Sequence, residues 1–290
     1  MKYIILLIVV IQISCIPLKA QLHSSFNTDY IFCTVLLEKR INSTFVPHGT
    51  GFLILDYSEK YSHYLVTCEH VLKNSEIYLS IPATTEIIEK LNSLGRNSVL
   101  IGDNIWILDG NILRIGVKLH LNKTYVKHDS LDIGVIGVSI GSWLIDNDTI
   151  KMSNVLGIPR SLISRKKDVP LGIDVYFSGF PYMIGTTFGL LNTKKYSSHI
   201  PTPLIRKGIL AWKDSDSNEF LLDAFSYSGN SGSPVFIQAD LYNKPMLIGM
   251  VFGHLPSMAT DNMGLARCVW INDILDTIKK FQELDPHQAQ

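Results

Sequence analysis

The chain has 290 residues, of which 46% are apolar and 18% are charged, a balance typical of folded rather than disordered proteins. Lysine plus arginine equals aspartate plus glutamate at 26 each, and no basic stripe stands out along the chain. This even balance argues against a nucleic-acid-binding protein and against one held electrostatically on an anionic membrane.

The first twenty residues have the pattern of an export leader. Lys2 gives a positive start, residues 3–10 are apolar throughout, and Leu18 and Ala20 occupy the two positions that a signal peptidase reads. We therefore expect a signal peptide (1–20) and an exported protein, secreted or periplasmic. The apolar run and all later runs are short for a bilayer span, so stable membrane insertion is not expected. An uncleaved anchor and a lipoprotein route through Cys15 are the alternatives.

Short strand-like runs dominate the rest of the chain. They are rich in Val, Ile, Phe and Tyr and are bounded by Gly, Asn, Asp and Pro, which indicates an all-β sandwich or barrel. The runs are residues 30–37, 51–57, 63–68, 75–81, 98–102, 104–110, 132–138, 174–180, 207–212, 219–225, 234–239, 245–253 and 265–271. A polar stretch, 146–154, has the composition of a connection between two halves. The pattern predicts two six-stranded antiparallel β-barrels, one over 21–150 and the other, with a C-terminal α-helix, over 151–290.

Two helices are expected. Residues 84–95 end at a glycine stop, and a terminal helix starts with Asn272 as its cap. In the terminal helix, Ile274, Ile278 and Phe281 fall on one face at helical spacing, so that face should be buried.

Three cysteines, Cys33, Cys68 and Cys268, follow the predicted leader. None has the spacing of a zinc site, and an odd number allows at most one internal disulfide. The sequence favours buried small hydrophobic side chains over a bridge, and no metal or cofactor is expected.

Three stretches carry residue types that suit nucleophilic catalysis. "YLVTCEHVL" (64–72) brings His70 to the end of a strand, "SLDIGVIGV" (130–138) puts Asp132 at the start of one, and "GNSGSP" (229–234) holds Ser231 in a glycine-rich turn. Each alone is explained by a surface histidine, a strand-start aspartate or an ordinary turn. Together they supply a hydroxyl nucleophile, an imidazole base and a carboxylate that orients the base.

The glycines around Ser231 fit the same chemistry. When a serine attacks a carbonyl, the oxygen becomes an oxyanion that backbone N–H groups can stabilise. Gly229 permits close approach and unusual dihedral angles, so the N–H groups of Gly229 and Ser231 are the candidate oxyanion donors. The order His–Asp–Ser and the scarcity of intervening helices disfavour an α/β-hydrolase.

At these positions the chain resembles the trypsin-like serine proteases, and it looks closest to their bacterial HtrA-type branch. The matching stretches are "HGTGFLI" (48–54), "LVTCEHVL" (65–72), "LDIGVIGV" (131–138), "SGFPYMIG" (178–185) and "LDAFSYSGNSGSPVF" (222–236). The resemblance implies a chymotrypsin-like fold forming one peptidase domain, with the site between its barrels. It also implies that His70 is the general base, Asp132 the orienting acid, Ser231 the nucleophile and Gly229 an oxyanion donor.

The chain departs from the family pattern at three points. Cys68 and Glu69 stand where two small residues are usual, and Gly134 replaces a common alanine. The residues after Ser231 are too few for the PDZ-type peptide-binding module that HtrA-type enzymes append, so tail-sensing regulation is not implied.

Family position also suggests a substrate pocket. Phe225 maps to the pocket floor, and "GMVFGH" (249–254) to its wall, which includes Phe252 and His254. Phenylalanine cannot pair with a cation, so we expect an uncharged or small side chain on the residue before the cleaved bond.

The expected function is that of a secreted serine endopeptidase that acts on protein or peptide substrates through an acyl-enzyme. The alternative is a catalytically silent binding protein with a protease fold, and a third possibility is an esterase on the same fold.

Overall fold

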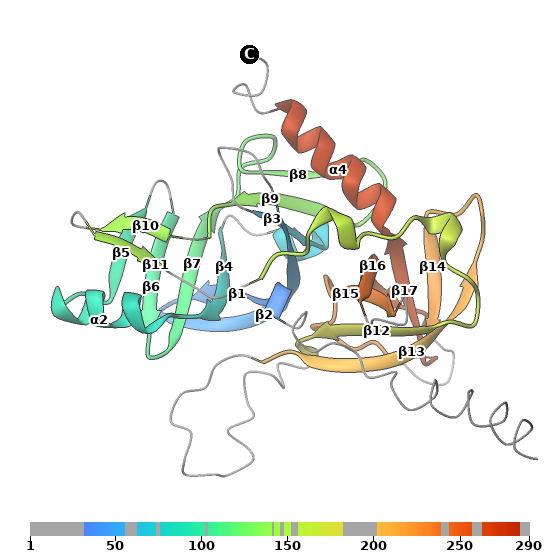
Figure 1. The fold of residues 1–290 in the computed structure, drawn as a ribbon, viewed down its shortest axis with the longest axis horizontal. Helices are drawn as coiled ribbons and strands as arrows, with labels where there is room; N and C mark the ends of the chain where they lie inside the picture. Colours follow the sequence, from blue (N-terminus) through green and yellow to red (C-terminus); the bar gives the residue numbers. More distant parts are fainter. Residues whose placement is uncertain are drawn as a thin grey trace, which may run out of the picture.

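The computed structural model describes residues 32–55, 63–73, 76–101, 104–140, 142–145, 148–151, 156–181, 202–238, 244–256 and 263–284. The predicted signal peptide (1–20) lies outside these residues. The described chain is mostly β-strand, arranged as two neighbouring β-structures with a C-terminal helix against both (Figure 1). Within these ranges, none of the helices has the length and apolar character needed to cross a membrane.

The first half forms one nine-stranded antiparallel sheet in the order β5-β6-β7-β4-β1-β2-β3-β9-β8. Its strands are β1 (Thr34–Ile41), β2 (Thr44–Leu55), β3 (His63–Thr67), β4 (Glu76–Pro82), β5 (Ser98–Ile101), β6 (Asn104–Asp109), β7 (Ile112–Lys118), β8 (Tyr125–Lys127) and β9 (Gly134–Val138). A separate two-stranded hairpin consists of β10 (Ser142–Ile145) and β11 (Asp148–Lys151).

This sheet differs from the predicted six-stranded barrel. Across the described residues it has β5 and β8 as its ends and is not closed, so a second barrel is not confirmed. Two strands that the sequence pattern missed, β8 and β7, belong to this sheet, and β7 decides its extent. Strand β7 pairs with β4 on one side and with β6 on the other, and so it adds the β5–β6 hairpin to the sheet.

The second half is a closed six-stranded barrel, as predicted. Its strand order is β12-β13-β14-β17-β16-β15, and β15 pairs back with β12. The strands are β12 (Asp174–Gly179), β13 (Leu204–Lys213), β14 (Glu219–Asp223), β15 (Pro234–Gln238), β16 (Pro245–His254) and β17 (Leu265–Trp270). Closure pairs every strand on both sides, which leaves no open sheet edge in this half.

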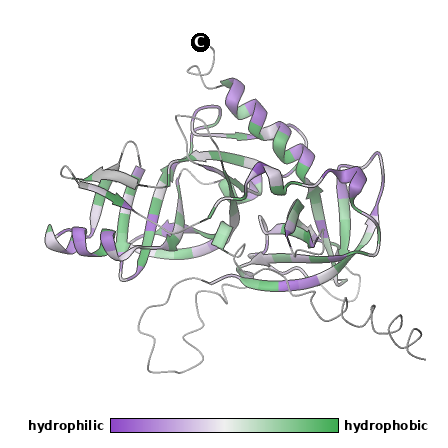
Figure 2. Cartoon of the chain, in the orientation of Figure 1, coloured by the Kyte–Doolittle hydropathy of each residue, from purple (hydrophilic) through white to green (hydrophobic). Residues whose placement is uncertain are grey.

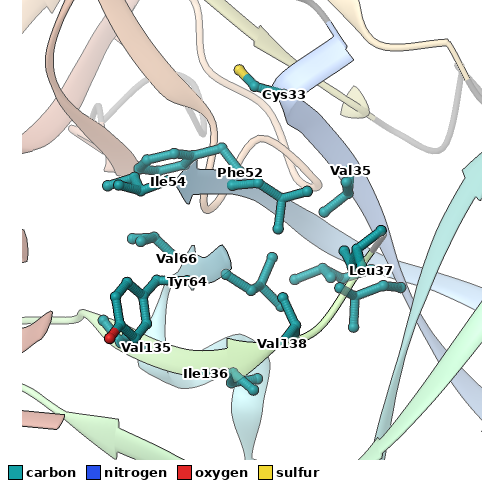
Figure 3. Packing of buried hydrophobic residues seen from close by; sticks show 14 of the residues in the cluster. Cys33, Val35, Leu37, Phe52, Ile54, Tyr64, Val66, Val135, Ile136 and Val138 are labelled. Atoms are coloured by element: carbon teal, nitrogen blue, oxygen red, sulfur yellow. The ribbon is translucent and has the colours of Figure 1, made fainter. Parts of the chain in front are cut away.

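The core of the first half lies between the central strands of the nine-stranded sheet. Figure 3 shows side chains from β1, β2, β3 and β9 converging on one another. The labelled members are Cys33, Val35, Leu37, Phe52, Ile54, Tyr64, Val66, Val135, Ile136 and Val138. All are buried, and burial of apolar area of this kind is the main force holding such a sheet together. The barrel has a core cluster of its own, centred on Phe220 and Trp270, whose rings lie 4.2 Å apart.

The described link between the halves is the segment 156–164. Ile158 exchanges backbone hydrogen bonds with the β2 residues Leu53 and Leu55, and the Ser164 N–H then donates to Leu247 O in β16. Two short 3₁₀ turns, η3 (Arg160–Leu162) and η4 (Lys166–Asp168), belong to this region. This link follows the polar stretch 146–154, of which residues 148–151 pair as β11.

The C-terminal helix α4 (Ile271–Leu284) packs against both halves. Its buried face includes Ile274, Ile278 and Phe281 as predicted, and Figure 2 shows apolar and polar residues alternating along it. The Phe281 ring meets Tyr64 of β3 edge-on at 5.9 Å, while the helix also follows directly from β17. Asn272 is exposed inside the first turn rather than capping it, because the helix begins one residue earlier than predicted.

The other predicted helix is α2 (Thr85–Ser93), and it begins where a side chain satisfies its first turn. The Thr84 hydroxyl accepts a hydrogen bond from the Ile87 N–H at 3.3 Å, which is ordinary N-cap geometry. Among the described residues, Cys33, Cys68 and Cys268 are buried thiols not joined in disulfides, in agreement with their predicted role as small hydrophobic side chains.

Candidate active site

His70 is positioned by a strand end and a single tight turn. Strand β3 ends at Thr67, Cys68 keeps an extended backbone, and the 3₁₀ turn η2 (Glu69–Leu72) follows at once. Val71 and Leu72 of this turn are buried, whereas His70 is exposed on its other side. The turn is therefore anchored by its apolar residues and presents the imidazole outward.

Asp132 is brought to His70 by the pairing of β3 with β9. In that antiparallel pair Thr67 lies opposite Gly134, so the residues just after β3 and just before β9 meet. Asp132 Oδ2 lies 2.5 Å from His70 Nδ1, and Asp132 Oδ1 accepts a second hydrogen bond, 2.9 Å long, from the His70 backbone N–H. The carboxylate thus fixes both the backbone and the ring of His70.

The environment keeps Asp132 ionised. Burial alone would raise its pKa, but hydrogen bonds from the His70 ring and backbone outweigh burial and hold the pKa below its usual range. Asp132 is therefore a carboxylate at neutral pH, and His70 Nδ1 donates its proton to it. In this tautomer His70 Nε2 carries a lone pair that can accept a proton.

Gly134 explains how the η2 turn can lie so close to β9. A Cβ atom at this position would come within 2.5 Å of Leu72 Cδ1. The departure from alanine noted in the sequence therefore has a packing reason, which is to make room for a leucine beneath the histidine turn.

The turn that carries Ser231 is fastened to β2 through Thr50. The Thr50 N–H donates to Ser231 O at 3.0 Å, and the Thr50 hydroxyl donates to Gly229 O at 2.6 Å. The same hydroxyl accepts a 3.0 Å hydrogen bond from the Phe180 N–H, just beyond β12. Thr50 is fully buried, so one side chain ties the serine turn to strands of both halves.

Two backbone amides of the serine turn are left unbonded. The N–H groups of Asn230, Gly232 and Ser233 donate to backbone carbonyls of Tyr227, Val251 and Asn230. Within the described residues, the N–H groups of Gly229 and Ser231 have no such acceptor. These are the two amides predicted to stabilise an oxyanion, and Gly229 adopts a positive φ of 94° that suits glycine.

Ser231 lies on a turn beside the His70 turn, and no hydrogen bond joins the two side chains in the described part of the chain. An ideal Cβ on Gly49 would lie 2.9 Å from Val71 Cγ1 and 3.6 Å from Ser231 O, so β2 touches both segments at one point. The structure brings His70 and Asp132 into direct contact and sets Ser231 on an adjoining turn.

Gly232 makes this adjoining turn possible. It adopts a φ of 93°, and a Cβ there would lie 1.8 Å from Thr50 O and 2.6 Å from Thr67 Oγ1. We expect Gly232→Ala to lower the free energy of unfolding by roughly 2–6 kcal/mol, because it adds backbone strain to overpacking. Urea denaturation measures this loss.

Gly253→Ala is the matched control, because a Cβ on Gly253 meets nothing within 4 Å. A loss for Gly232→Ala no larger than that for Gly253→Ala would contradict the steric account of the turn.

The predicted pocket residues lie on neighbouring barrel segments. Phe225, two residues beyond β14, is 52% exposed and stacks on Tyr227 with ring centroids 6.0 Å apart. Phe252 and His254 are both in β16, where the Phe252 ring lies 4.7 Å from the Arg267 guanidinium. A second cation, Arg206, lies beside Phe225 and Tyr227. Arg206 Nη1 donates to Phe225 O at 3.2 Å, and its guanidinium lies 4.5 Å above the Tyr227 ring.

Sequence reasoning missed two residues of this region. Thr50 was quoted only as part of "HGTGFLI", although a hydroxyl between two glycines in a strand is a signal for close backbone approach. Cys68 lies between the two parts of the site. Its thiol contacts Val251 O at 3.6 Å, and both burial and the nearby Asp132 charge raise the pKa of this thiol well above its usual range.

No protein-family model matches the chain, and no curated protein matches it. Among solved structures, the chain is similar to Rv3671c from M. tuberculosis H37Rv, described as the inactive form of a serine-to-alanine mutant. The TM-score is 0.46 and the sequence identity 12%, over 92% of this chain and 95% of that chain. Residue roles in this chain therefore rest on its own geometry.

Proposed function

We propose that the protein is an exported serine endopeptidase that hydrolyses peptide bonds through an acyl-enzyme. The observation that carries the proposal is the His70–Asp132 pair, with its 2.5 Å contact, beside a serine turn that has two unbonded amides. A carboxylate that fixes a neutral imidazole leaves Nε2 able to take a proton from a nearby hydroxyl.

In the proposed mechanism His70 removes the Ser231 hydroxyl proton as the oxygen attacks the substrate carbonyl. The Gly229 and Ser231 N–H groups stabilise the oxyanion that forms, and each such donor is worth roughly 3–4 kcal/mol in related sites. His70 then gives the proton to the leaving amine, and water repeats the sequence to release the acid. Asp132 stabilises the imidazolium throughout, because its own pKa is held low.

The preferred substrate in this proposal has an uncharged or small side chain before the cleaved bond. Phe225 offers no carboxylate to pair with arginine or lysine, and Arg206 adds a positive charge close by. A peptide panel varied only at that position tests the preference, and faster cleavage after arginine or lysine contradicts it.

A catalytically silent binding protein is the second candidate. It is favoured by one observation, the lack of a Ser231–His70 hydrogen bond in the described residues. Catalytic hydrogen bonds are often long in the absence of substrate and tighten when substrate binds. The missing bond therefore does not outweigh the His70–Asp132 contact beside the serine turn.

Labelling with a fluorophosphonate probe distinguishes the two functions. An active site of the proposed kind labels Ser231, because the probe reacts only with an activated hydroxyl. Both Ser231→Ala and His70→Ala should abolish the label, and peptide mapping should locate it on Ser231. A folded protein that does not react, or that reacts equally well without His70, supports the silent binding protein instead.

Thr50 gives a further test of this site. Thr50→Val keeps the shape of the side chain but removes the hydroxyl that holds Gly229 O and accepts from the Phe180 N–H. We expect kcat to fall on the order of 10²-fold with a smaller change in KM, because misplacing the oxyanion donors affects the transition state most.

Thr50→Ser keeps the hydroxyl and should restore most of kcat. A loss in the serine variant as large as that in the valine variant would show that the hydrogen bonds of the Thr50 hydroxyl do not by themselves account for its effect on kcat.

A further inference from the structure

Cys68 brings a third metal-ligating group to the His70–Asp132 pair. One ligand atom from each of Cys68, His70 and Asp132 lies within 4.8 Å of the other two. This cluster has no metal-site spacing in the sequence, because Cys68 and His70 are separated by one residue and Asp132 comes from the turn before β9. Pairing of β3 with β9 creates it.

The three groups are the ligand types that zinc prefers. Zn²⁺ binds thiolate at about 2.3 Å, imidazole at about 2.0 Å and carboxylate at about 2.0–2.2 Å, and three protein ligands with an open fourth position are common. Tetrahedral bonds of these lengths hold ligand atoms roughly 3.3–3.8 Å apart. The 2.5 Å contact between His70 Nδ1 and Asp132 Oδ2 must therefore widen by roughly 1 Å, and Cys68 Sγ, which lies within 4.8 Å of both, must approach them by at most about 1.5 Å.

An ion can reach the cluster from one side. The side chains of His70 and Asp132 are 42% and 26% exposed, whereas Cys68 is fully buried beneath them. The Cys68 thiol donates a weak 3.6 Å hydrogen bond to Val251 O, also interacts with the Gly232 backbone N–H, and takes no part in the proposed hydrolysis. To bind a metal, its sulfur must give up these contacts and its proton, which burial and the nearby Asp132 charge otherwise hold in place, so the cation itself must drive the exchange.

We propose that Cys68, His70 and Asp132 form a binding site for Zn²⁺ or a similar thiophilic divalent cation, and that the bound ion reversibly inhibits the protein. The cation forms bonds to the sulfur, to Nδ1 and to the carboxylate. The thiol proton leaves to solvent, and the Nδ1 proton moves to Nε2 by tautomer exchange, so charge and atoms balance without any redox step. With Nε2 protonated, His70 cannot accept the Ser231 proton. Only the inhibition rests on the proposed function, because binding of the ion does not require catalysis.

Cadmium is a direct probe, because thiolate ligation produces an ultraviolet charge-transfer absorption that oxygen and nitrogen ligands do not. Titration of the full chain with Cd²⁺ should give this absorption at one equivalent, and equilibrium dialysis with Zn²⁺ should give one competing site. All variants carry Cys15→Ser wherever the first twenty residues are retained.

Cys68→Ser should remove the absorption and weaken Zn²⁺ binding at least tenfold. Cys268→Ser is the matched control, since Cys268 is equally buried but belongs to the barrel, and it should bind like the parent. If Cys68→Ser does not fold, the more exposed His70 provides the second variant, and His70→Gln should weaken Zn²⁺ binding by a similar factor. Absorption that is missing in the parent, or that persists in folded Cys68→Ser, overturns the site.

Inhibition is measured separately from binding. Zn²⁺ should slow peptide hydrolysis by the parent, EDTA should reverse the effect, and Cys68→Ser should raise the half-inhibitory concentration at least tenfold relative to its own metal-free rate. A parent that binds Cd²⁺ through a thiolate but hydrolyses no peptide contradicts the proposed function and leaves the ion site standing. A parent that hydrolyses peptides but binds no Cd²⁺ overturns the ion site and leaves the proposed function standing.

Discussion

Ser231→Ala should reduce peptide turnover by a factor on the order of 10⁶ while the protein stays folded. The loss is this large because the hydroxyl is the proposed nucleophile, and the remaining amides can only stabilise an oxyanion formed by attack of water. Ser231 is only partly buried and its side chain makes no hydrogen bond within the described residues, so removing the hydroxyl should leave stability nearly unchanged. Initial rates with a fluorogenic peptide measure the effect.

The matched control is Ser215→Ala, an exposed serine in the turn before β14. It should keep the parent rate. A rate for Ser231→Ala within tenfold of the parent would show that this serine is not the nucleophile.

Asp132→Asn should lower kcat by roughly 10⁴, the second largest effect expected. The amide oxygen can still accept from the His70 backbone N–H, so the turn should keep its place. The amide nitrogen then faces Nδ1 and donates to it, which drives the ring proton onto Nε2. In that tautomer Nε2 has no lone pair to receive the Ser231 proton.

Asp129→Asn is the control, because Asp129 is an exposed carboxylate whose partner is Lys280, on the surface of α4. The same chemical change three residues away should leave kcat at the parent value. Stability to urea should match the parent in both variants, and equal kcat losses in the two would point to a general charge effect rather than to tautomer control.

Much of the strand pattern could be predicted, because runs of β-branched and aromatic residues bounded by turn residues indicate strands from the local sequence alone. Every predicted run overlaps a strand of the structure, and the barrel of the second half follows from six of them. The missed strand β7 begins just after Gly110 and Asn111, where a tight turn reverses the chain between two apolar runs. Its effect on sheet size could not be predicted, because sheet order depends on pairings between distant segments.

The site was predictable only in part for a related reason. His70 and Asp132 each adjoin a strand end, and the pairing of those strands brings them together. The roles of Thr50 and Cys68 arise from contacts with segments more than one hundred and fifty residues away. The glycines beside Thr50 indicate a close backbone approach, but no local pattern identifies the segment that approaches, and nothing near Cys68 in the sequence distinguishes it from an ordinary core cysteine.

Helix α4 has a consequence for how the protein unfolds. It continues from β17 of the barrel, and its Gln282 side chain donates to the Tyr64 hydroxyl in β3 at 3.0 Å. Thr34 and Ser178 share a buried hydrogen bond of 2.6 Å across the same boundary. Neither half can melt without exposing the apolar face of this helix, so heat should denature the molecule in a single cooperative transition rather than in two steps.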